Sequence, residues 1–403
     1  SRAAPANSLT NSLSATLSRN NRSALGRWFW TIDRPLLVMV LMLIGCGALA
    51  VAAASPAAAH RYSGGSVVVG DLYYLKRQIL WIMAGVPVML AVSMLPIVWA
   101  KRLAIAGTAF CIVALMLVPI LGHEANGATR WLQLPGFGFQ PSEFLKPLFI
   151  VTTAWLLSAR IEDPTMPTMQ LSFLLLLIVA ALLVKQPDFG QTALFSAVWL
   201  SQAVLAGMGL SVIGILIVLA VGGIGVAYLF VPHVTSRIDR FITGGGDTYQ
   251  IDRALDCFRA GGLFGTGPGE GRMKFKLPEP HTDYIFSVVG EEFGAIACML
   301  LAILYLAIVV RVLLQLLDEE DPFIFLAAAG LVTQFGLQAA INMAVNLKLL
   351  PSKGMTLPFI SHGGSSYLAL ALGMGLLLAL TRRNPFLKAS PYAGRWQAAC
   401  PQR

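Results

Sequence analysis

Residues 277–294 read Leu277-Pro-Glu-Pro-His-Thr-Asp-Tyr-Ile-Phe-Ser-Val-Val-Gly-Glu-Glu-Phe-Gly294, and they join the longest polar segment of the chain to a hydrophobic helix. Pro278 and Pro280 keep the approach extended, because a residue before proline is disfavoured in the helical region. Asp283 then falls in the first turn of the predicted helix, where a carboxylate suits the helix dipole. Three small residues lie within about 40° of it on the same face: Ser287, Gly290 and Gly294. The pattern predicts either a capping acid above a packing seam or an acid above a furrow for a ligand.

The composition is that of a membrane protein, since 56% of the 403 residues are hydrophobic and only 12% are charged. Apolar runs of about 18 or more residues recur along the chain, as in polytopic helical membrane proteins. The net charge of +9 comes from cations scattered through the loops. This scatter favours membrane lipids or an anionic substrate as partners and argues against nucleic acid. The five cysteines have neither metal-ligand nor disulfide spacing.

The apolar runs predict an all-α fold with about ten transmembrane helices. A basic arm, predicted to be disordered, covers residues 1–34; the membrane domain covers 35–381, and a cytoplasmic tail covers 382–403. A large extracytoplasmic loop, 232–282, separates helices seven and eight, and apolar periodicity predicts a short surface helix near residues 251–258 within it. The predicted spans lie near Pro35–Ala54, Leu80–Ala100, Leu103–Leu121, Phe144–Leu157, Leu171–Val184, Thr192–Met208, Ile213–Val231, Tyr284–Leu304, Phe323–Val345 and Ser366–Leu380.

The basic arm favours a cytoplasmic N-terminus, and with ten spans the C-terminus is then cytoplasmic too. The linkers after spans three, five, seven and nine share the extracytoplasmic face, and they contain most of the polar clusters of the sequence. This crowding predicts a functional site on that face. A transporter is expected instead to place its charges toward the bilayer midplane.

Each polar cluster has a structural and a functional interpretation. Glu143 and Lys146 share a helix face and form either an interfacial ion pair or part of a site. Arg130 is an interfacial anchor or an anion ligand, and Asp188 caps the next helix or orients a cation. Lys353 lies in a linker broken by Gly and Pro, where it is a solvated lysine or a cation at the mouth of the site.

Taken in order over about residues 30–388, five motifs of this chain resemble the SEDS family (shape, elongation, division and sporulation). The segment Pro351–Pro358 resembles the division branch, because elongation members usually lack its lysine. His362 and Tyr284 depart from the family pattern, which often has Tyr and Phe at these places. The motifs are Gly138-Phe-Gln-Pro-Ser-Glu-Phe-Leu-Lys146, Gln186-Pro-Asp-Phe-Gly190, Leu277-Pro-Glu-Pro-His-Thr-Asp283, Gly290-Glu-Glu-Phe-Gly294 and Leu357-Pro-Phe-Ile-Ser-His-Gly-Gly-Ser-Ser366.

The resemblance implies a ten-helix glycosyltransferase of the bacterial inner membrane that polymerises lipid II into peptidoglycan at the division septum. Its active site is then periplasmic, and Asp283 matches the family's essential carboxylate. The resemblance also implies a class B penicillin-binding protein, an FtsI-like transpeptidase, as partner and the FtsL–FtsB–FtsQ complex as activator. The sequence specifies no cofactor, and it leaves open a divalent metal such as magnesium.

The residue types suit such a transfer. Asp283 is expected to act as general base toward the 4-hydroxyl of the acceptor sugar, with undecaprenyl diphosphate as leaving group. Burial would raise the pKa of this aspartate and neighbouring cations would lower it. Cations are expected to bind the diphosphate and acids to orient the cations. The residues expected to contact or orient the substrate are Arg130, Glu143, Lys146, Asp188, Lys353 and Ser365.

Two other functions compete with catalysis. A lipid II flippase would also use intramembrane charges and broken helices. A non-catalytic scaffold of the division machinery would leave Asp283 without a role.

Overall fold

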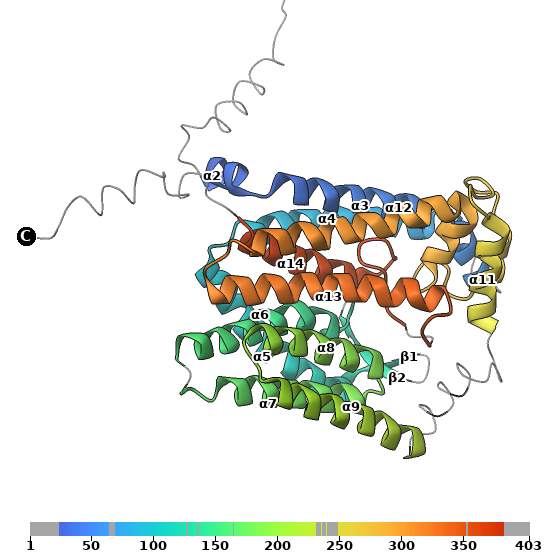
Figure 1. Ribbon diagram of the computed structural model, residues 1–403. Helices are drawn as coiled ribbons and strands as arrows, with labels where there is room; N and C mark the ends of the chain where they lie inside the picture. Colours follow the sequence, from blue (N-terminus) through green and yellow to red (C-terminus); the bar gives the residue numbers. More distant parts are fainter. Residues whose placement is uncertain are drawn as a thin grey trace, which may run out of the picture.

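The computed structural model describes residues 24–63, 69–125, 128–134, 137–163, 165–230, 235, 239, 249–351 and 354–382. Its long helices lie side by side in one bundle (Figure 1). The elements are, in chain order, α2 (Ala24–Thr31), α3 (Arg34–Tyr62), α4 (Tyr73–Ser93), α5 (Ile97–Leu121), β1 (His123–Ala125), β2 (Ala128–Leu134), β3 (Phe137–Phe139), α6 (Pro141–Glu162), α7 (Thr168–Lys185), α8 (Phe189–Leu205), α9 (Leu210–Phe230), α11 (Tyr249–Gly261), η1 (Met273–Lys276), α12 (Ile285–Leu316), α13 (Pro322–Asn346) and α14 (Gly364–Leu380).

The prediction of a polytopic helical membrane protein is confirmed. Eight of the described helices are long and apolar enough to cross a membrane, namely α3, α4, α5, α6, α7, α9, α12 and α13. The apolar helices α8 and α14, with 17 residues each, correspond to the other two predicted spans. Each of the ten predicted spans therefore overlaps a different apolar helix, although the ends differ.

The boundary between the second and third spans was predicted wrongly. The predicted break lay at Lys101-Arg102, because charged pairs usually occur in loops. The structure ends α4 at Ser93 and uses Pro96 as the N-cap of α5. Proline lacks the N–H that a continuing helix needs, so it determines the break more strongly than charge does. The ammonium of Lys101 instead lies 4.0 Å from the centre of the Phe323 ring.

One buried glutamine ties three central helices together. The amide nitrogen of Gln202, on α8, donates to the carbonyl of Ile150 on α6 at 2.9 Å and to that of Leu326 on α13 at 3.1 Å. Its amide oxygen accepts a hydrogen bond from Thr153 Oγ1 at 2.8 Å. Gly330 lets α13 approach, since a Cβ there would lie 2.4 Å from Gln202 Nε2. Small residues and side-chain hydrogen bonds are the usual interfaces between membrane helices.

The prediction that residues 1–34 form a disordered arm is wrong for the last part of this segment. Residues 1–23 lie outside the described part of the chain, but Ala24–Thr31 form helix α2. Trp28 Nε1 donates to Ser93 Oγ at 2.8 Å, which fixes α2 against the end of α4. The Arg34 guanidinium lies 4.5 Å from the centre of the Phe29 ring. The aromatic residues thus supply packing that the Ser- and Asn-rich composition of the arm did not indicate.

The segments outside the helical bundle gather at the end opposite α2, where β1, β2 and α11 lie (Figure 1). Helix α11 confirms the predicted surface helix near residues 251–258. The three short strands form an antiparallel sheet in the order β1-β2-β3, which the sequence analysis did not predict. Strands this short carry too little alternation to be recognised in the sequence. They leave the helical architecture unchanged.

Helix α12 is broken at Gly294, where the backbone has φ 80° and ψ 175°. The carbonyls of Glu291 and Glu292 accept hydrogen bonds from the backbone of residues 266–267 at 2.9 and 3.1 Å. The predicted furrow below Asp283 is therefore wrong, because α11 packs over Gly290 and the 262–267 turn is joined to the break. The alternative interpretation, a packing seam, is confirmed for Gly290, where a Cβ would lie 2.3 Å from the Phe258 ring.

Candidate active site

Asp283 lies in the turn just before α12, which begins at Ile285, and not within the helix as the sequence suggested. Its carbonyl oxygen accepts hydrogen bonds from Asn342 Nδ2 at 2.9 Å and from Asn346 Nδ2 at 3.0 Å. Asn346 Oδ1 in turn accepts from Ser287 Oγ at 2.7 Å. These amides hold the backbone of Asp283 against α13, so the position of its side chain is set by two helices.

The side chain of Asp283 is directed toward the segment after α13. A Cβ built on Gly354 would lie 3.2 Å from Asp283 Oδ2. Among the described residues, no hydrogen bond or ion pair reaches this carboxylate. Lys353 precedes Gly354 and lies outside the described residues. The structure therefore brings the linkers after spans seven and nine together at this carboxylate.

Burial, together with the smaller effect of the negative charge on Glu279, raises the pKa of Asp283 from 3.8 to about 7. Two opposing effects on this pKa were considered from the sequence, burial and neighbouring cations. Among the residues that the structure describes, burial is the larger effect. Glu279 was not singled out from the sequence. Its carboxylate accepts hydrogen bonds from Tyr62 at 2.6 Å and from Thr282 Oγ1 at 3.0 Å, which keep the second charge next to Asp283.

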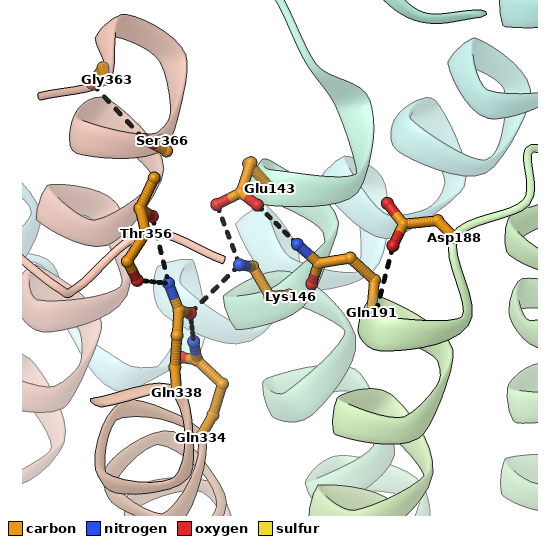
Figure 2. A network of polar contacts seen from close by, with 9 residues as sticks. All are labelled: Glu143, Lys146, Asp188, Gln191, Gln334, Gln338, Thr356, Gly363 and Ser366. Carbon is orange, nitrogen blue, oxygen red and sulfur yellow. Dashed lines mark hydrogen bonds and ion pairs between the residues drawn. The ribbon is translucent and has the colours of Figure 1, made fainter. Parts of the chain in front are cut away.

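The predicted ion pair between Glu143 and Lys146 is present near the start of α6. The Lys146 ammonium lies 2.8 Å from Glu143 Oε2, and the two side chains are 3% and 6% exposed. Lys146 Nζ also donates to Gln338 Oε1 at 3.1 Å, and Gln191 Nε2 donates to Glu143 Oε1 at 2.8 Å (Figure 2). An ion pair this buried is stable only with such additional hydrogen bonds. The interpretation as a lipid-facing pair is therefore wrong.

Asp188 and Arg130 come together at the edge of this network. Asp188 caps α8, because its carboxylate accepts from the backbone N–H of Gln191 at 3.2 Å (Figure 2). Arg130 Nε lies 3.9 Å from Asp188 Oδ2, and its Nη2 donates to the Pro187 carbonyl at 3.0 Å. Burial raises the pKa of Asp188, and the Arg130 charge opposes that effect. The predicted cap is confirmed. The ion pair with Arg130 fits the predicted orientation of a cation, which stays a prediction.

Ser365 lies in the first turn of α14 and is 1% exposed. Its hydroxyl has no hydrogen-bond partner among the described residues. No hydrogen bond joins it to another predicted site residue in the described part of the chain, so its expected role in substrate binding stays a prediction.

A row of amide side chains lies on α13 and was not predicted from the sequence. These residues recur every four positions and so share one face of the helix. Gln338 Nε2 donates to the Thr356 carbonyl at 3.0 Å (Figure 2). Asn342 Nδ2 donates to the Met355 carbonyl at 2.6 Å. The row therefore connects the Glu143–Lys146 pair with the backbone next to Asp283. An apolar helix with amides at a spacing of four was the available signal, and the members are Gln334, Gln338, Asn342 and Asn346.

Fold and site together define a polytopic membrane protein that has a carboxyl group of raised pKa beside a buried charged network. Residues 34–385 match the family described as "Cell cycle protein", the family of FtsW, RodA and SpoVE. This chain belongs to that family. The expectation of a SEDS protein is thereby confirmed, and the FtsW relatives described next confirm the division type.

Several relatives are similar over nearly the whole chain. A protein of Caulobacter vibrioides, named "Probable peptidoglycan glycosyltransferase FtsW", is 43% identical over 91% of this chain and 94% of its own length. A protein of Trichlorobacter lovleyi with the same name is 34% identical over 90% of this chain and 96% of its own length.

Solved structures share the fold. A chain of a peptidoglycan synthase complex has a TM-score of 0.70 and 24% identity, covering 87% of this chain and 97% of that one. The rod shape determining protein RodA of Thermus thermophilus has a TM-score of 0.65 and 26% identity, covering 87% of this chain and 96% of that one.

Proposed function

We propose that this chain is a peptidoglycan glycosyltransferase that polymerises lipid II into septal glycan strands, with Asp283 as its general base. The observation that carries the proposal is the carboxyl group of Asp283, whose pKa is raised to about 7 and which no described side chain neutralises. A general base works best when its pKa is near the working pH. The names of the relatives support the substrate class.

The reaction is a one-step displacement at C1 of the donor sugar. Asp283 accepts the proton of the acceptor's 4-hydroxyl while the oxygen forms the new bond to C1. The bond from C1 to the diphosphate oxygen breaks, and undecaprenyl diphosphate leaves with the electron pair. Direct attack of this kind inverts the configuration at C1. Diphosphate is a stable anion, so the leaving group needs positive charge and no proton donor.

Arg130 and Lys353 are the cations that we propose contact the diphosphate. The Arg130 side chain is 29% exposed, so part of its guanidinium is free to meet an anion. Lys353 precedes Gly354, which lies against Asp283. Lys146 is only 3% exposed and is paired with Glu143, so it reaches a diphosphate only after a rearrangement. In the described conformation its charge holds the network together.

The proposed setting follows from the same family. The protein is a multi-pass membrane protein, and we place it in the inner membrane at the division septum. Both termini are cytoplasmic in this proposal, and Asp283 faces the periplasm, where lipid II is used. A class B penicillin-binding protein of the FtsI type acts with it, and the FtsL–FtsB–FtsQ complex activates the pair.

A divalent metal such as magnesium is part of the proposal as an ion brought with the diphosphate. Magnesium commonly binds through one or two carboxylates together with phosphate oxygens of a substrate. The described part of the chain has no group of three or more acidic, His or Cys side chains placed to hold a metal ion, so such an ion would be held mainly by the diphosphate oxygens of the substrate. Its contribution would be to neutralise the leaving group. Polymerisation in EDTA with magnesium added back tests it.

The central experiment compares Asp283→Asn with the parent protein. Purified protein and its penicillin-binding partner are incubated with labelled lipid II, and glycan polymer is measured. The Asn variant is expected to make no polymer above background, because an amide accepts no proton at neutral pH. Normal polymer formation by this variant would show that the assignment of the base is wrong.

A matched control is Asp252→Asn on α11. Asp252 pairs with Lys348 at 3.2 Å on the exposed surface, so its loss is expected to leave polymerisation unchanged. Flipping of lipid II in sealed liposomes is measured with the same variants. A chain that flips lipid II without making polymer would favour the transporter over the enzyme.

A further inference from the structure

The turn that follows α11 is hydrogen-bonded to the break in α12. The backbone N–H of Ala295 donates to the Gly262 carbonyl at 2.9 Å, and that of Ile296 donates to the Leu263 carbonyl at 3.2 Å. A Cβ on Gly294 would lie 2.3 Å from the Leu263 carbonyl oxygen, so only glycine permits this approach. These bonds fix the position of the turn along α12.

Two large apolar side chains project from this turn. Leu263 is 62% exposed and Phe264 is 80% exposed. No charged residue occurs from Gly261 to Gly269, so the turn lacks the polar composition of an ordinary hydrated loop. Apolar side chains presented in this way mark a surface that contacts another apolar phase.

The length of α12 places this turn at the edge of the bilayer. From Ala295 to Leu316 the helix rises about 33 Å at about 1.5 Å per residue, which matches a hydrocarbon thickness of about 30 Å. The acidic run Asp318–Asp321 follows at the far end. The hydrocarbon region along α12 therefore begins close to Gly294, at the level of the turn.

The exposed side chains of α12 form one apolar stripe that starts at the same level. Ile296, which is bonded to the turn, is 37% exposed, and Met299, Leu300 and Ile303 are 54%, 62% and 58% exposed. Such a stripe faces lipid in a membrane helix. The tip of the turn continues this stripe toward the side of the bilayer on which Asp283 lies.

We propose that Leu263 and Phe264 insert into the lipid leaflet on the Asp283 side and anchor the turn after α11 to the membrane. Phenylalanine and leucine suit this depth, where the headgroup region meets the acyl chains. The surface binds lipid and not a partner protein, because two side chains are far smaller than the roughly 800 Å² per partner of a stable protein interface. Insertion of Leu263 and Phe264 also keeps the turn against α12. This helix begins at Ile285, two residues after Asp283.

The test places an environment-sensitive fluorophore at single cysteines of the full-length protein in phosphatidylethanolamine–phosphatidylglycerol liposomes. Cys46 is exposed and Cys400 lies outside the described residues, so both are first replaced by serine. The label is then attached at Phe264→Cys. Quenching by lipids with a doxyl group near the headgroup is compared with quenching by aqueous iodide.

Two matched positions calibrate the result. Leu300→Cys lies on the lipid-facing stripe, and Glu270→Cys lies in the exposed polar continuation of the same loop. Doxyl lipid is expected to quench the label at 264 to within about twofold of the label at 300. Iodide is expected to quench the label at 264 at least about fivefold less than the label at 270. All three sites are exposed, so the substitutions leave the core intact.

Iodide quenching at 264 equal to that at 270 would overturn the proposal, because the tip would then lie in water. Loss of doxyl quenching at 264 when the penicillin-binding partner is added would also overturn it, because a protein would then cover the tip. A second measurement uses Leu263→Ser with Phe264→Ser. Amide hydrogen exchange over residues 262–267 is expected to rise at least about tenfold in liposomes, and unchanged exchange would contradict an anchoring role.

Discussion

The pH dependence of polymerisation tests the role of Asp283 most directly. Burial, with a further contribution from Glu279, raises the pKa of this carboxyl from 3.8 to about 7. A base accepts a proton only in its ionised form, so the rate follows the deprotonated fraction. With a pKa of about 7 that fraction is about one half at pH 7 and about one tenth at pH 6. An aspartate of ordinary pKa would be fully ionised at both.

Polymerisation is therefore expected to fall about fivefold between pH 7 and pH 6. The variant Glu279→Gln removes the second cause of the raised pKa, so its acidic limb should shift to lower pH. The glutamine oxygen can still accept from one of the two hydroxyls, Tyr62 or Thr282, and the amide nitrogen can donate to the other, which limits structural change. At pH 6, Glu279→Gln should therefore retain a larger fraction of its own maximal rate than the parent protein retains of its maximal rate.

The assay measures initial rates of polymer formation from labelled lipid II between pH 5.5 and 8.5, at saturating substrate and constant ionic strength. The melting temperature at each pH separates loss of fold from loss of ionisation. Asp252→Asn, on the same face, serves as the control and should keep the parent profile. A rate that is constant from pH 5.5 to 8 would refute the reasoning, as would a limb that does not move in Glu279→Gln.

Three substitutions test the structural supports of the site. Lys274 and Glu292 form a buried ion pair. Lys274→Met leaves Glu292 unpaired, which should cost about 3–5 kcal/mol of stability and lower the melting temperature. Adding Glu292→Gln should restore part of this loss. Gly294→Ala should lower the free energy of unfolding by about 1–3 kcal/mol, because φ at this position is 80°. The control Gly214→Ala on α9 should not destabilise the fold, because no atom lies within 4 Å of the new methyl group. Gln202→Leu removes hydrogen bonds between α6, α8 and α13 and should cost about 1–2 kcal/mol, measured by chemical unfolding in detergent.

Hydrophobicity alone was enough to predict the helical bundle, because each span must bury its backbone in hydrogen bonds and present apolar side chains to lipid. The position of a helix end depends on finer effects. The break between the second and third spans lies near Pro96, which lacks a backbone N–H, and not at Lys101 and Arg102. Lys101 therefore lies inside α5, where its ammonium packs over the ring of Phe323. The break at Gly294 could not be predicted, since it depends on a turn that begins more than thirty residues earlier in the chain.

The sequence was enough to predict the charged residues of the candidate site, but not the hydrogen bonds that connect them. The sequence indicated that Glu143, Lys146 and Asp188 lie on the same side as Asp283, because alternating spans place their linkers on one face. It did not indicate that Lys146 is buried, since an ion pair at a helix start is equally common at a lipid boundary. The row of amides on α13 escaped notice because amide side chains carry no charge.

The base and the charged network meet at one short segment of backbone, residues 354–356. Gln338 and Asn342, one turn apart on α13, donate to carbonyls of this segment at 3.0 and 2.6 Å. The same Gln338 accepts a hydrogen bond from Lys146 at 3.1 Å, and the first residue of the segment lies against the carboxylate of Asp283. Burial is the largest cause of the raised pKa of Asp283, so any shift of this segment changes how much water reaches the base. The hydrogen bonds that hold this segment on α13 therefore help to maintain the burial that raises the pKa of Asp283.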